Sequence, residues 1–249
     1  MGDARYDAIG HGYAANRRED PELRARIWAA LGDSRTVVNV GAGAGSYEPP
    51  DRHVIAIEPS DVMAAQRLAD RVPALRGSAT PLPLRDDAAD AAMAILTIHH
   101  WDDELEAGVR ELRRVARGPV VIVTFDASVS AEMWLLADYA PEMTALDASF
   151  PSMDELASWL GGTVQVEPIL TGATRRTGRW RRSGRTRSGC STRRRAATSG
   201  FARLDPEVCA RVVADVERDL HDGTWDARHG ELRTLAAYDA GMRLVVARP

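Results

Sequence analysis

Short apolar runs alternate with amphipathic helical segments between residue 20 and about residue 170. The runs predicted as buried strands are 36–40, 54–57, 91–98, 120–125 and 163–169. The segments predicted as helices are 21–31, 61–72, 104–117 and 153–160. Continuous apolar runs such as 91–98 are typical of parallel sheets, because helices cover both faces of such sheets. The alternation therefore predicts a doubly wound α/β fold with three layers, α/β/α, around a mostly parallel sheet of seven strands.

The C-terminal part adds one helix and one strand. Asp205-Pro206 is typical of a helix start, and 242–247 is expected to be the last strand, antiparallel beside 163–169. The length of 249 residues suits one large domain. We expect a single domain over 1–249. Its predicted parts are an N-terminal helical cap (1–35), a core (36–169), an Arg-rich insert (170–200) and a C-terminal helix and strand (201–249).

The chain is acidic outside one basic segment. It contains no Lys, and its 32 Arg stand against 36 acidic residues, which gives a net charge of −4. The 29 residues of 172–200 hold ten Arg and no acidic residue, so the rest of the chain, with 22 Arg against all 36 acidic residues, has a net charge of −14. Because 172–200 contains no Leu, Ile, Val or Met, it cannot form an apolar core by itself.

Three explanations fit this Arg-rich segment. It can be a basic arm that binds RNA or DNA, with Trp180 available to stack on bases. It can be a linker without fixed structure. We favour a third explanation, two compensating frameshifts. Suitable GC-rich codons let the offset frame read 184–194 as a plausible amphipathic segment and 170–178 as a polar turn that ends in Thr-Asp-Gly. The gene sequence decides, since a stop codon in the offset frame excludes a frameshift.

Three closely spaced glycines end the first predicted strand. Gly41, Gly43 and Gly45 form Gly-x-Gly-x-Gly, and Glu58 ends the next strand. Glycines let the backbone approach a ligand, and a carboxylate after the second strand can bind both ribose hydroxyls. Ser46 stands where a dinucleotide-binding loop has its third glycine. The spacing therefore disfavours NAD and FAD and favours a nucleoside ligand without a pyrophosphate, of which S-adenosylmethionine is the usual one. A glycine-rich turn that only packs is the alternative.

The glycine loop is one of several motifs that occur in order over some 120 residues. They are Asn39–Tyr47, Ala56–Ser60, Leu82–Leu84 before Asp90, Thr97–Trp101, Glu111–Val115 and Val120–Asp126. With them, the region from residue 6 to about 169 resembles the class I S-adenosylmethionine-dependent methyltransferases, in the type 11 group that acts on small molecules. The resemblance implies a Rossmann-like fold and S-adenosylmethionine as the cofactor. Two positions depart from the family pattern: Asn39, where Asp is more frequent, and Ser78–Thr80, where an acidic residue often lies near the adenine.

The resemblance also implies which residues bind the cofactor. They are Tyr13, Arg17, Gly41, Ala42, Gly43, Gly45, Glu58, Pro59, Met63, Ser78, Ala79 and Thr97. In the family, 41–43 would lie against the methionine and ribose parts, and Glu58 would bind the ribose diol. Met63 would pack on the adenine, with an ordinary core methionine as the alternative. The adenine would otherwise meet backbone amides and the Ser78 hydroxyl.

Two of these residues lie in the amphipathic N-terminal segment. The resemblance places Tyr13 and Arg17 where they can close over the site and meet the methionine carboxylate of the cofactor. A solvated helix face is the alternative for both.

His99 and His100 stand at the carboxyl end of the fourth predicted strand, where ligands bind in such sheets. Adjacent strand side chains point to opposite faces, so at most one of the two is expected to face a substrate. A general base is needed only where the nucleophile must lose a proton. We predict His100 as that base or as a group that orients the substrate, with a structural histidine as the alternative. Trp101 either walls the substrate pocket or caps the core. No metal site is predicted.

These observations predict an enzyme that transfers a methyl group from S-adenosylmethionine to a small-molecule acceptor. The alternatives are an RNA-associated methyltransferase or RNA-binding protein that uses 172–200, and a cofactor-binding protein without turnover. The acidic remainder disfavours nucleic acid as a partner. Two cysteines are too few for a disulfide framework, the longest apolar run is too short to cross a membrane, and the N-terminus has no signal-peptide core. We therefore expect a cytoplasmic protein.

Overall fold

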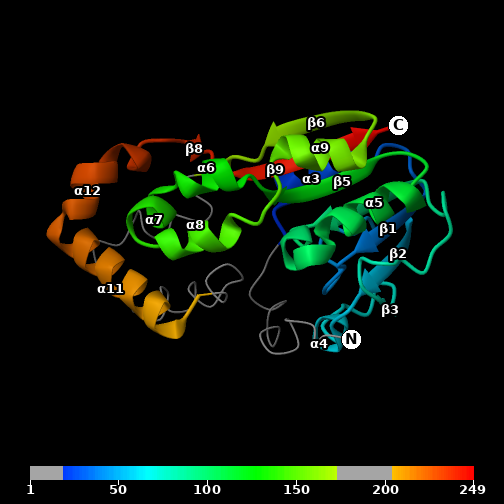
Figure 1. The fold of residues 1–249 in the computed structure, drawn as a ribbon, viewed down its shortest axis with the longest axis horizontal. Coiled ribbons are helices and arrows are strands. Elements are labelled where there is room, and N and C mark those ends of the chain that lie inside the picture. The colour runs from blue at the N-terminus through cyan, green and yellow to red at the C-terminus, as the bar shows by residue number, and fades with distance from the viewer. Residues whose placement is uncertain (1–18, 173–203) are drawn as a thin grey trace. The chain divides into compact units, whose positions relative to one another are not determined.

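The computed structural model describes residues 19–172 and 204–249 (Figure 1). The described residues up to Phe125, together with Pro151–Glu167 and Arg243–Pro249, form one compact unit, here unit 1. Asp126–Phe150 and the described residues from Pro168 to Met242 form unit 2. The single domain expected over 1–249 stays a prediction. The predictions for Tyr13, for Arg17 and for nearly all of the Arg-rich segment lie outside the described residues.

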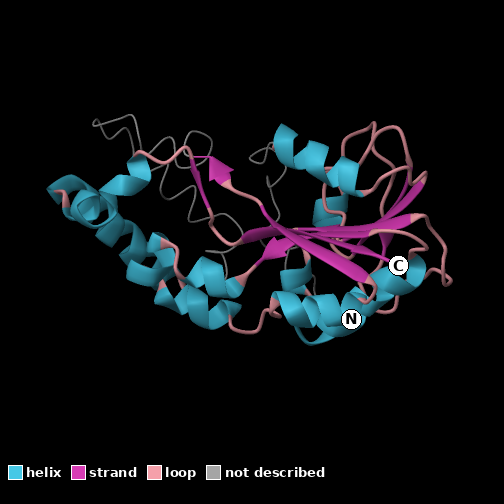
Figure 2. Ribbon diagram, turned by 90° about the horizontal axis from the view of Figure 1, so that it is seen from above, coloured by secondary structure: helices cyan, strands magenta, loops and turns pink. Residues whose placement is uncertain are grey.

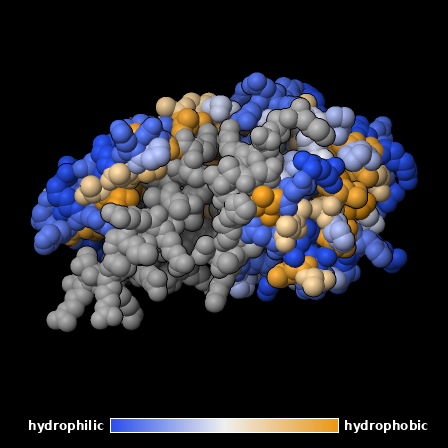
Figure 3. Space-filling model, turned by 90° about the horizontal axis from the view of Figure 1, so that it is seen from below, coloured by the Kyte–Doolittle hydropathy of each residue, from blue (hydrophilic) through white to orange (hydrophobic). Residues whose placement is uncertain are grey.

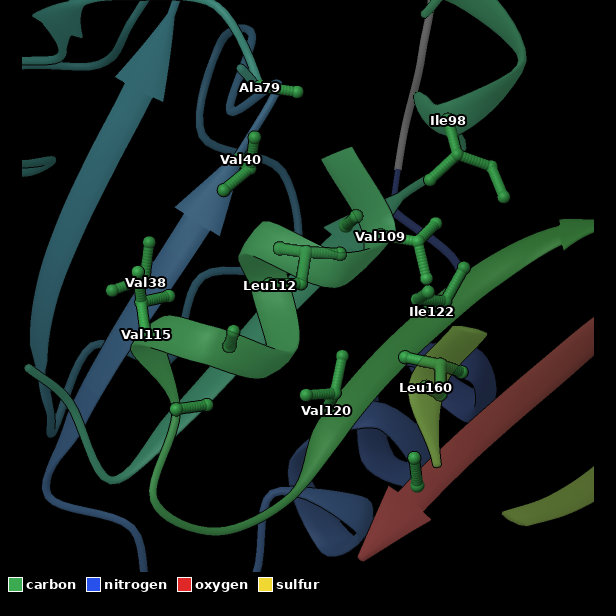
Figure 4. Close-up of a cluster of buried hydrophobic side chains, with 14 of the residues drawn as sticks. Val38, Val40, Ala79, Ile98, Val109, Leu112, Val115, Val120, Ile122 and Leu160 are labelled. Atoms are coloured by element: carbon green, nitrogen blue, oxygen red, sulfur yellow. The ribbon is translucent and has the colours of Figure 1, made fainter. Parts of the chain in front are cut away.

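Unit 1 is built on a seven-stranded sheet in the order β3-β2-β1-β4-β5-β9-β6. The strands are β1 (Thr36–Val40), β2 (His53–Glu58), β3 (Leu75–Arg76), β4 (Ala91–Ile95), β5 (Val120–Phe125), β6 (Thr163–Pro168) and β9 (Met242–Arg248). The strands from β3 to β5 pair in parallel, and β9 runs antiparallel to β5 (Figure 4). The predicted Rossmann-like class, with seven strands and an antiparallel last strand beside 163–169, is confirmed.

Helices cover both faces of this sheet (Figures 1 and 2). One face carries α5 (Leu105–Val115) and α9 (Met153–Leu160), and the other carries α3 (Pro21–Ala30). The predicted start of α3 is confirmed, because the Asp20 side chain accepts hydrogen bonds from the amides of Glu22 and Leu23 at 2.9 and 3.3 Å, and Pro21 occupies the first turn.

The core of unit 1 lies between the sheet and α5. Figure 4 shows Val109, Leu112 and Val115 of α5 above the strands, with Val38 of β1 and Val120 of β5 beside them. All five side chains are buried. The helical spacing of these apolar residues in the sequence predicted this face, and burial of branched aliphatic side chains of this size is worth about 1.5–3 kcal/mol each.

Two predicted elements are shorter than the sequence indicated. β4 ends at Ile95 because Leu96 adopts a positive φ of 55°, and Ile98–His100 forms a 3₁₀ turn in place of more strand. The helix predicted over 61–72 is only α4 (Asp61–Ala64). The apolar stripe that suggested a longer helix has little buried surface to face, since Leu68 is 65% exposed.

The described part of unit 2 consists of one long helix, α11, and several short helices around a small core of its own. Its helices are α6 (Ala127–Ala131), α7 (Trp134–Asp138), α8 (Pro141–Asp147), α11 (Pro206–Asp222) and α12 (Thr224–His229), followed by the 3₁₀ turn η4 (Gly230–Arg233). β7 (Thr171–Gly172) and β8 (Ala237–Tyr238) pair antiparallel. The helix predicted from Asp205-Pro206 is confirmed as α11, with Val212 and Val216 buried against Leu136 and Tyr139.

The surface of the described residues is mixed. Figure 3 views the molecule from below relative to Figure 1, and on that face the apolar side chains form small patches among hydrophilic ones. The large apolar side chains with the greatest exposure include Leu68, Leu75 and Leu170. Within 19–172 and 204–249, no helix combines the length and the apolar character needed to cross a membrane.

Candidate functional site

The glycine loop follows β1 at the point where the strand order reverses, with β2 on one side of β1 and β4 on the other. Ligands of open α/β sheets bind at this point, beyond the carboxyl ends of the strands. Gly41, Gly43 and Gly45 have φ angles of +67°, +52° and +87°. The amides of Gly41 and Ala42 donate to the carbonyl of Ile57 in β2, at 2.9 and 3.0 Å, which fixes the start of the loop against the neighbouring strand.

Thr97 reaches the loop from the end of β4. A Cβ added to Gly41 would overlap Thr97 Oγ1 and would lie 2.8 Å from Thr97 Cβ. Thr97 is itself buried. Glycine is therefore required at position 41 for two reasons, its positive φ and the close approach of Thr97.

Glu58 binds the loop from the end of β2. Its Oε2 accepts a hydrogen bond from the Gly43 amide at 2.7 Å, and its Oε1 accepts one from the Ser60 amide at 2.9 Å. The side chain is buried. A carboxylate has about four acceptor positions, so two amides and a ribose diol can share one carboxylate. The arrangement therefore fits the role that the sequence predicts for Glu58, in which the carboxylate binds both ribose hydroxyls.

Two further predicted residues, Pro59 and Met63, lie along the same edge. Met63, in α4, is buried, and its Cε would lie 3.3 Å from a Cβ on Gly43. Pro59, between Glu58 and Ser60, is exposed. The Ser60 side chain caps α4 by accepting a hydrogen bond from the Met63 amide. Met63 thus lies directly against the loop, and both its packing on the adenine and a purely structural role stay open.

Ser78 and Ala79 differ in what their side chains do. Ala79 is buried in the core of unit 1, where it packs near Gly108 of α5. Ser78 is exposed, and its hydroxyl donates to the carbonyl of Thr80 at 2.6 Å. Trp101 also packs against Gly108 and the core of unit 1, which is the contact expected of a residue that caps the core.

The expectation that His99 and His100 point to opposite faces is wrong. Both lie in the 3₁₀ turn that follows β4, and their ring centroids are 3.9 Å apart with an angle of 53° between the planes. The ring of Phe125, at the end of β5, meets His99 edge-on at 6.1 Å. The alternation rule fails because the backbone leaves the strand at Leu96, so neighbouring side chains no longer point in opposite directions.

The N-terminal segment is attached to the loop through Glu19. The Glu19 carboxylate accepts a hydrogen bond from the Tyr47 amide at 2.8 Å and lies 3.7 Å from the Arg71 guanidinium. Tyr47 is two residues beyond Gly45.

A buried polar cluster that the sequence did not predict lies behind the loop, formed by Asn39, Glu48 and Arg67. The Arg67 guanidinium forms an ion pair with Glu48 at 2.7 Å, and the Asn39 amide donates to Glu48 at 2.9 Å. The only hint in the sequence is an acidic residue directly after the glycine loop. Among residues 19–172 and 204–249, no group of three or more His, Cys, Asp or Glu side chains could hold a metal ion.

Comparison with known proteins identifies the fold family. Residues 38–123 match a family model described as a methyltransferase domain. The crystal structure of a protein assigned as a methyltransferase of an antibiotic biosynthesis pathway, from Anabaena variabilis ATCC 29413, is 27% identical and covers 92% of this chain and 97% of its own, with a TM-score of 0.76. Residues 38–123 thus form a methyltransferase domain, and the chain has the fold of the class I S-adenosylmethionine-dependent methyltransferases. S-adenosylmethionine is accordingly its cofactor.

Two other solved structures share the fold of this methyltransferase. The [4+2]-cyclase SpnF is 18% identical with a TM-score of 0.58, covering 98% of this chain and 93% of its own. Phosphoethanolamine N-methyltransferase 2 of Haemonchus contortus, in complex with S-adenosylmethionine, is 14% identical with a TM-score of 0.54, covering 92% of this chain and 52% of its own. At these identities the likeness shows the fold alone. No curated protein matches the sequence.

Proposed function

We propose that this methyltransferase transfers the methyl group of S-adenosylmethionine to a small-molecule acceptor, and that the glycine loop and Glu58 bind the cofactor. The observation that carries the proposal is the Glu58 carboxylate, buried at the end of β2 and hydrogen-bonded to the Gly43 amide within the loop. The Glu58 carboxylate therefore lies beside the glycine loop, at the point where the strand order of the sheet reverses, and it can accept hydrogen bonds from a ribose diol there.

The residues around this carboxylate have complementary roles in the proposal. Gly41 to Gly43 and Gly45 lie against the methionine and ribose parts of the cofactor, and Thr97 closes the loop from β4. Pro59 and Met63 lie on the adenine side, with the backbone of Ser78 and Ala79. Tyr13 and Arg17 cover the methionine carboxylate, which is supported by the attachment of Glu19 to the loop at Tyr47.

Bound S-adenosylmethionine supplies an electrophilic methyl group, which a lone pair of the acceptor takes by in-line SN2 displacement while sulfur keeps the electrons of the broken bond. The chain's own task is to hold the acceptor in line and to exclude water. His100 serves as the base that takes a proton from the acceptor, or as a group that orients it. The His99 ring lies beside the His100 ring, with the centroids 3.9 Å apart, so His99 is the neighbouring imidazole against which the role of His100 can be tested.

A small acceptor fits two properties of the chain. Outside 172–200 the net charge is −14, which disfavours an anionic polymer such as RNA. The similar protein from Anabaena variabilis is assigned to an antibiotic biosynthesis pathway, whose intermediates are small molecules. We keep the cytoplasm as the proposed location.

A transfer assay tests this proposal. The full chain is incubated with S-adenosylmethionine that carries a labelled methyl group and with a panel of phenols, amines and thiols, and the products are separated by mass. We expect label in at least one acceptor and a loss of about 100-fold in rate for His100→Asn with a protonated acceptor, whereas His99→Asn as a matched control loses less. Cofactor binding with no labelled product from any acceptor would favour a cofactor-binding protein without turnover.

A further inference from the structure

The Arg67 guanidinium connects three parts of the chain around the glycine loop. Its Nη1 donates to the carbonyl of Gly43 at 3.2 Å, and its Nε donates to the carbonyl of Val72 at 2.8 Å. Its Nη2 donates to both carboxylate oxygens of Glu48, at 2.9 and 2.7 Å. Each nitrogen of the rigid, planar guanidinium therefore binds a different partner, so the group fixes the carbonyls of Gly43 and Val72 and the carboxylate of Glu48 relative to one another.

The partner carboxylate is held equally closely. Glu48 is 1% exposed, and its Oε1 also accepts a hydrogen bond from the Asn39 side-chain amide at 2.9 Å. Asn39 lies on β1, two residues before Gly41, and is itself buried. The main-chain carbonyl of Glu48 accepts a further hydrogen bond from Arg71 at 2.6 Å.

The ion pair packs directly against the loop that the proposed function assigns to the cofactor. A Cβ added to Gly45 would lie 3.1 Å from Glu48 Oε2 and 3.3 Å from Arg67 Nη1. Gly43 is held from both sides, because its amide donates to Glu58 and its carbonyl accepts from Arg67. Gly43 and Gly45 are thus contacted by the charged groups of Glu58, Glu48 and Arg67, in addition to the packing of Met63 against Gly43.

Stability alone does not account for such a pair. Removing two charges from water costs about as much as their attraction returns, so a buried ion pair is weak evidence for stability. In some proteins a buried polar or ionic group is retained because it selects one conformation. We propose that Asn39, Glu48 and Arg67 are positioning residues that hold the glycine loop in the conformation that binds S-adenosylmethionine. This inference rests on the proposed cofactor site at the glycine loop.

The choice of an amide at position 39 follows from the same geometry. The Asn39 amide donates to a carboxylate that already belongs to an ion pair, so the cluster holds one negative and one positive charge. Asp at position 39 would bring a second carboxylate to the place of the amide, where like charges repel. Moving the carboxylate to position 39 and the amide to position 48 restores one charge of each sign.

The test is the dissociation constant of S-adenosylmethionine, measured by calorimetry on the full chain at a temperature where circular dichroism shows every variant folded. We expect Arg67→Met and Asn39→Asp each to weaken binding at least tenfold. The double variant Asn39→Asp with Glu48→Gln should return to within about threefold of the wild-type value. The matched control is Asp90→Asn, which removes a carboxylate that binds the amides of Arg35 and Thr36 at the opposite end of β1 and should lower the melting temperature without changing the dissociation constant.

Unchanged binding in Arg67→Met would overturn the inference, as would weakening in Asp90→Asn equal to that in Arg67→Met. If Arg67→Met does not fold, the variants at positions 39 and 48 test the inference instead. A positioning role is contradicted if Asn39→Asp binds S-adenosylmethionine as tightly as wild type, or if the double variant binds no more tightly than Asn39→Asp. Glu58→Ala separates this failure from that of the proposed site. Loss of binding in Glu58→Ala with normal binding in Arg67→Met refutes only the positioning role.

Discussion

Replacing Gly41 by Ala is expected to cost more stability than the same replacement at Gly32. Both glycines have positive φ, +67° at Gly41 and +57° at Gly32. They differ in what an added Cβ would meet: nothing within 4 Å at Gly32, and Thr97 Oγ1, Cβ and Cγ2 within 3 Å at Gly41. The pair therefore separates the cost of the backbone conformation from the cost of the contact.

The magnitude follows from these two terms. An L-residue in the left-handed region costs roughly 1–2 kcal/mol, and the smaller entropy of the unfolded chain with Ala offsets about 0.4–1 kcal/mol of it. Forcing an extra methyl group into packed surroundings adds about 1–3 kcal/mol. Thr97 cannot turn away easily, because it is buried and β-branched. Gly32→Ala should therefore cost about 1 kcal/mol, and Gly41→Ala about 2–4 kcal/mol.

Urea unfolding followed by circular dichroism gives both values, and the melting temperatures should differ by about 2–4 °C for each kcal/mol between the variants. In a double-mutant cycle, Thr97→Gly should recover most of the extra cost at Gly41. Equal destabilisation in the two glycine variants would refute the close approach of Thr97 to the loop.

Two further predictions concern pH. The hydrogen bond from Arg117, followed by those from the amides of Thr36 and Arg35, holds the pKa of Asp90 below its usual range. A group whose pKa is lower in the folded state stabilises the protein at pH values above its unfolded pKa. The free energy of unfolding of Asp90→Asn, measured in urea, should therefore lie below that of wild type by the full amount at pH 7, and the difference should shrink as the pH falls below about 4. A difference that does not depend on pH would contradict this. Burial, and then the hydrogen bond to Asp219, raises the pKa of Tyr139 to about 12. A group whose pKa is higher in the folded state stabilises the protein at pH values below its unfolded pKa. Tyr139→Phe should therefore lower the free energy of unfolding by about 1–3 kcal/mol at pH 7 and by progressively less from about pH 10 to 12. An unchanged free energy of unfolding at pH 7 would count against that hydrogen bond.

The sheet could be predicted from the sequence because its strands are buried on both faces. Thr36–Val40 and Val120–Phe125 match the predicted ranges, since continuous apolar runs have few other stable environments. The turn at Gly41, Gly43 and Gly45 could be predicted for a related reason. Positive φ and close backbone approach require glycine itself, so the requirement is visible in the residue type.

The rest depends on contacts between residues distant in the sequence. Nothing near Arg67 indicates that its guanidinium turns back to Glu48 and Gly43, so the segment after α4 was predicted as more helix. The side-by-side rings of His99 and His100 depend on one residue, Leu96, that leaves the strand conformation. Periodicity describes regular elements, and it fails where a single backbone angle ends one.

We propose that Glu58 binds the ribose diol of S-adenosylmethionine beside the glycine loop. A calorimetric cycle tests it, with wild type and Glu58→Ala each titrated with S-adenosylmethionine and with its 2′,3′-dideoxy analogue. Glu106→Ala, which removes an exposed carboxylate paired with Arg110, is the matched control.

A hydrogen bond to a charged group contributes about 1.5–3 kcal/mol, so losing the diol should weaken binding to wild type about 100-fold or more. Glu58→Ala should bind the natural cofactor as weakly and show no further loss with the analogue, while Glu106→Ala behaves as wild type. Wild-type affinity in Glu58→Ala, or a full penalty for the analogue in that variant, would contradict the account.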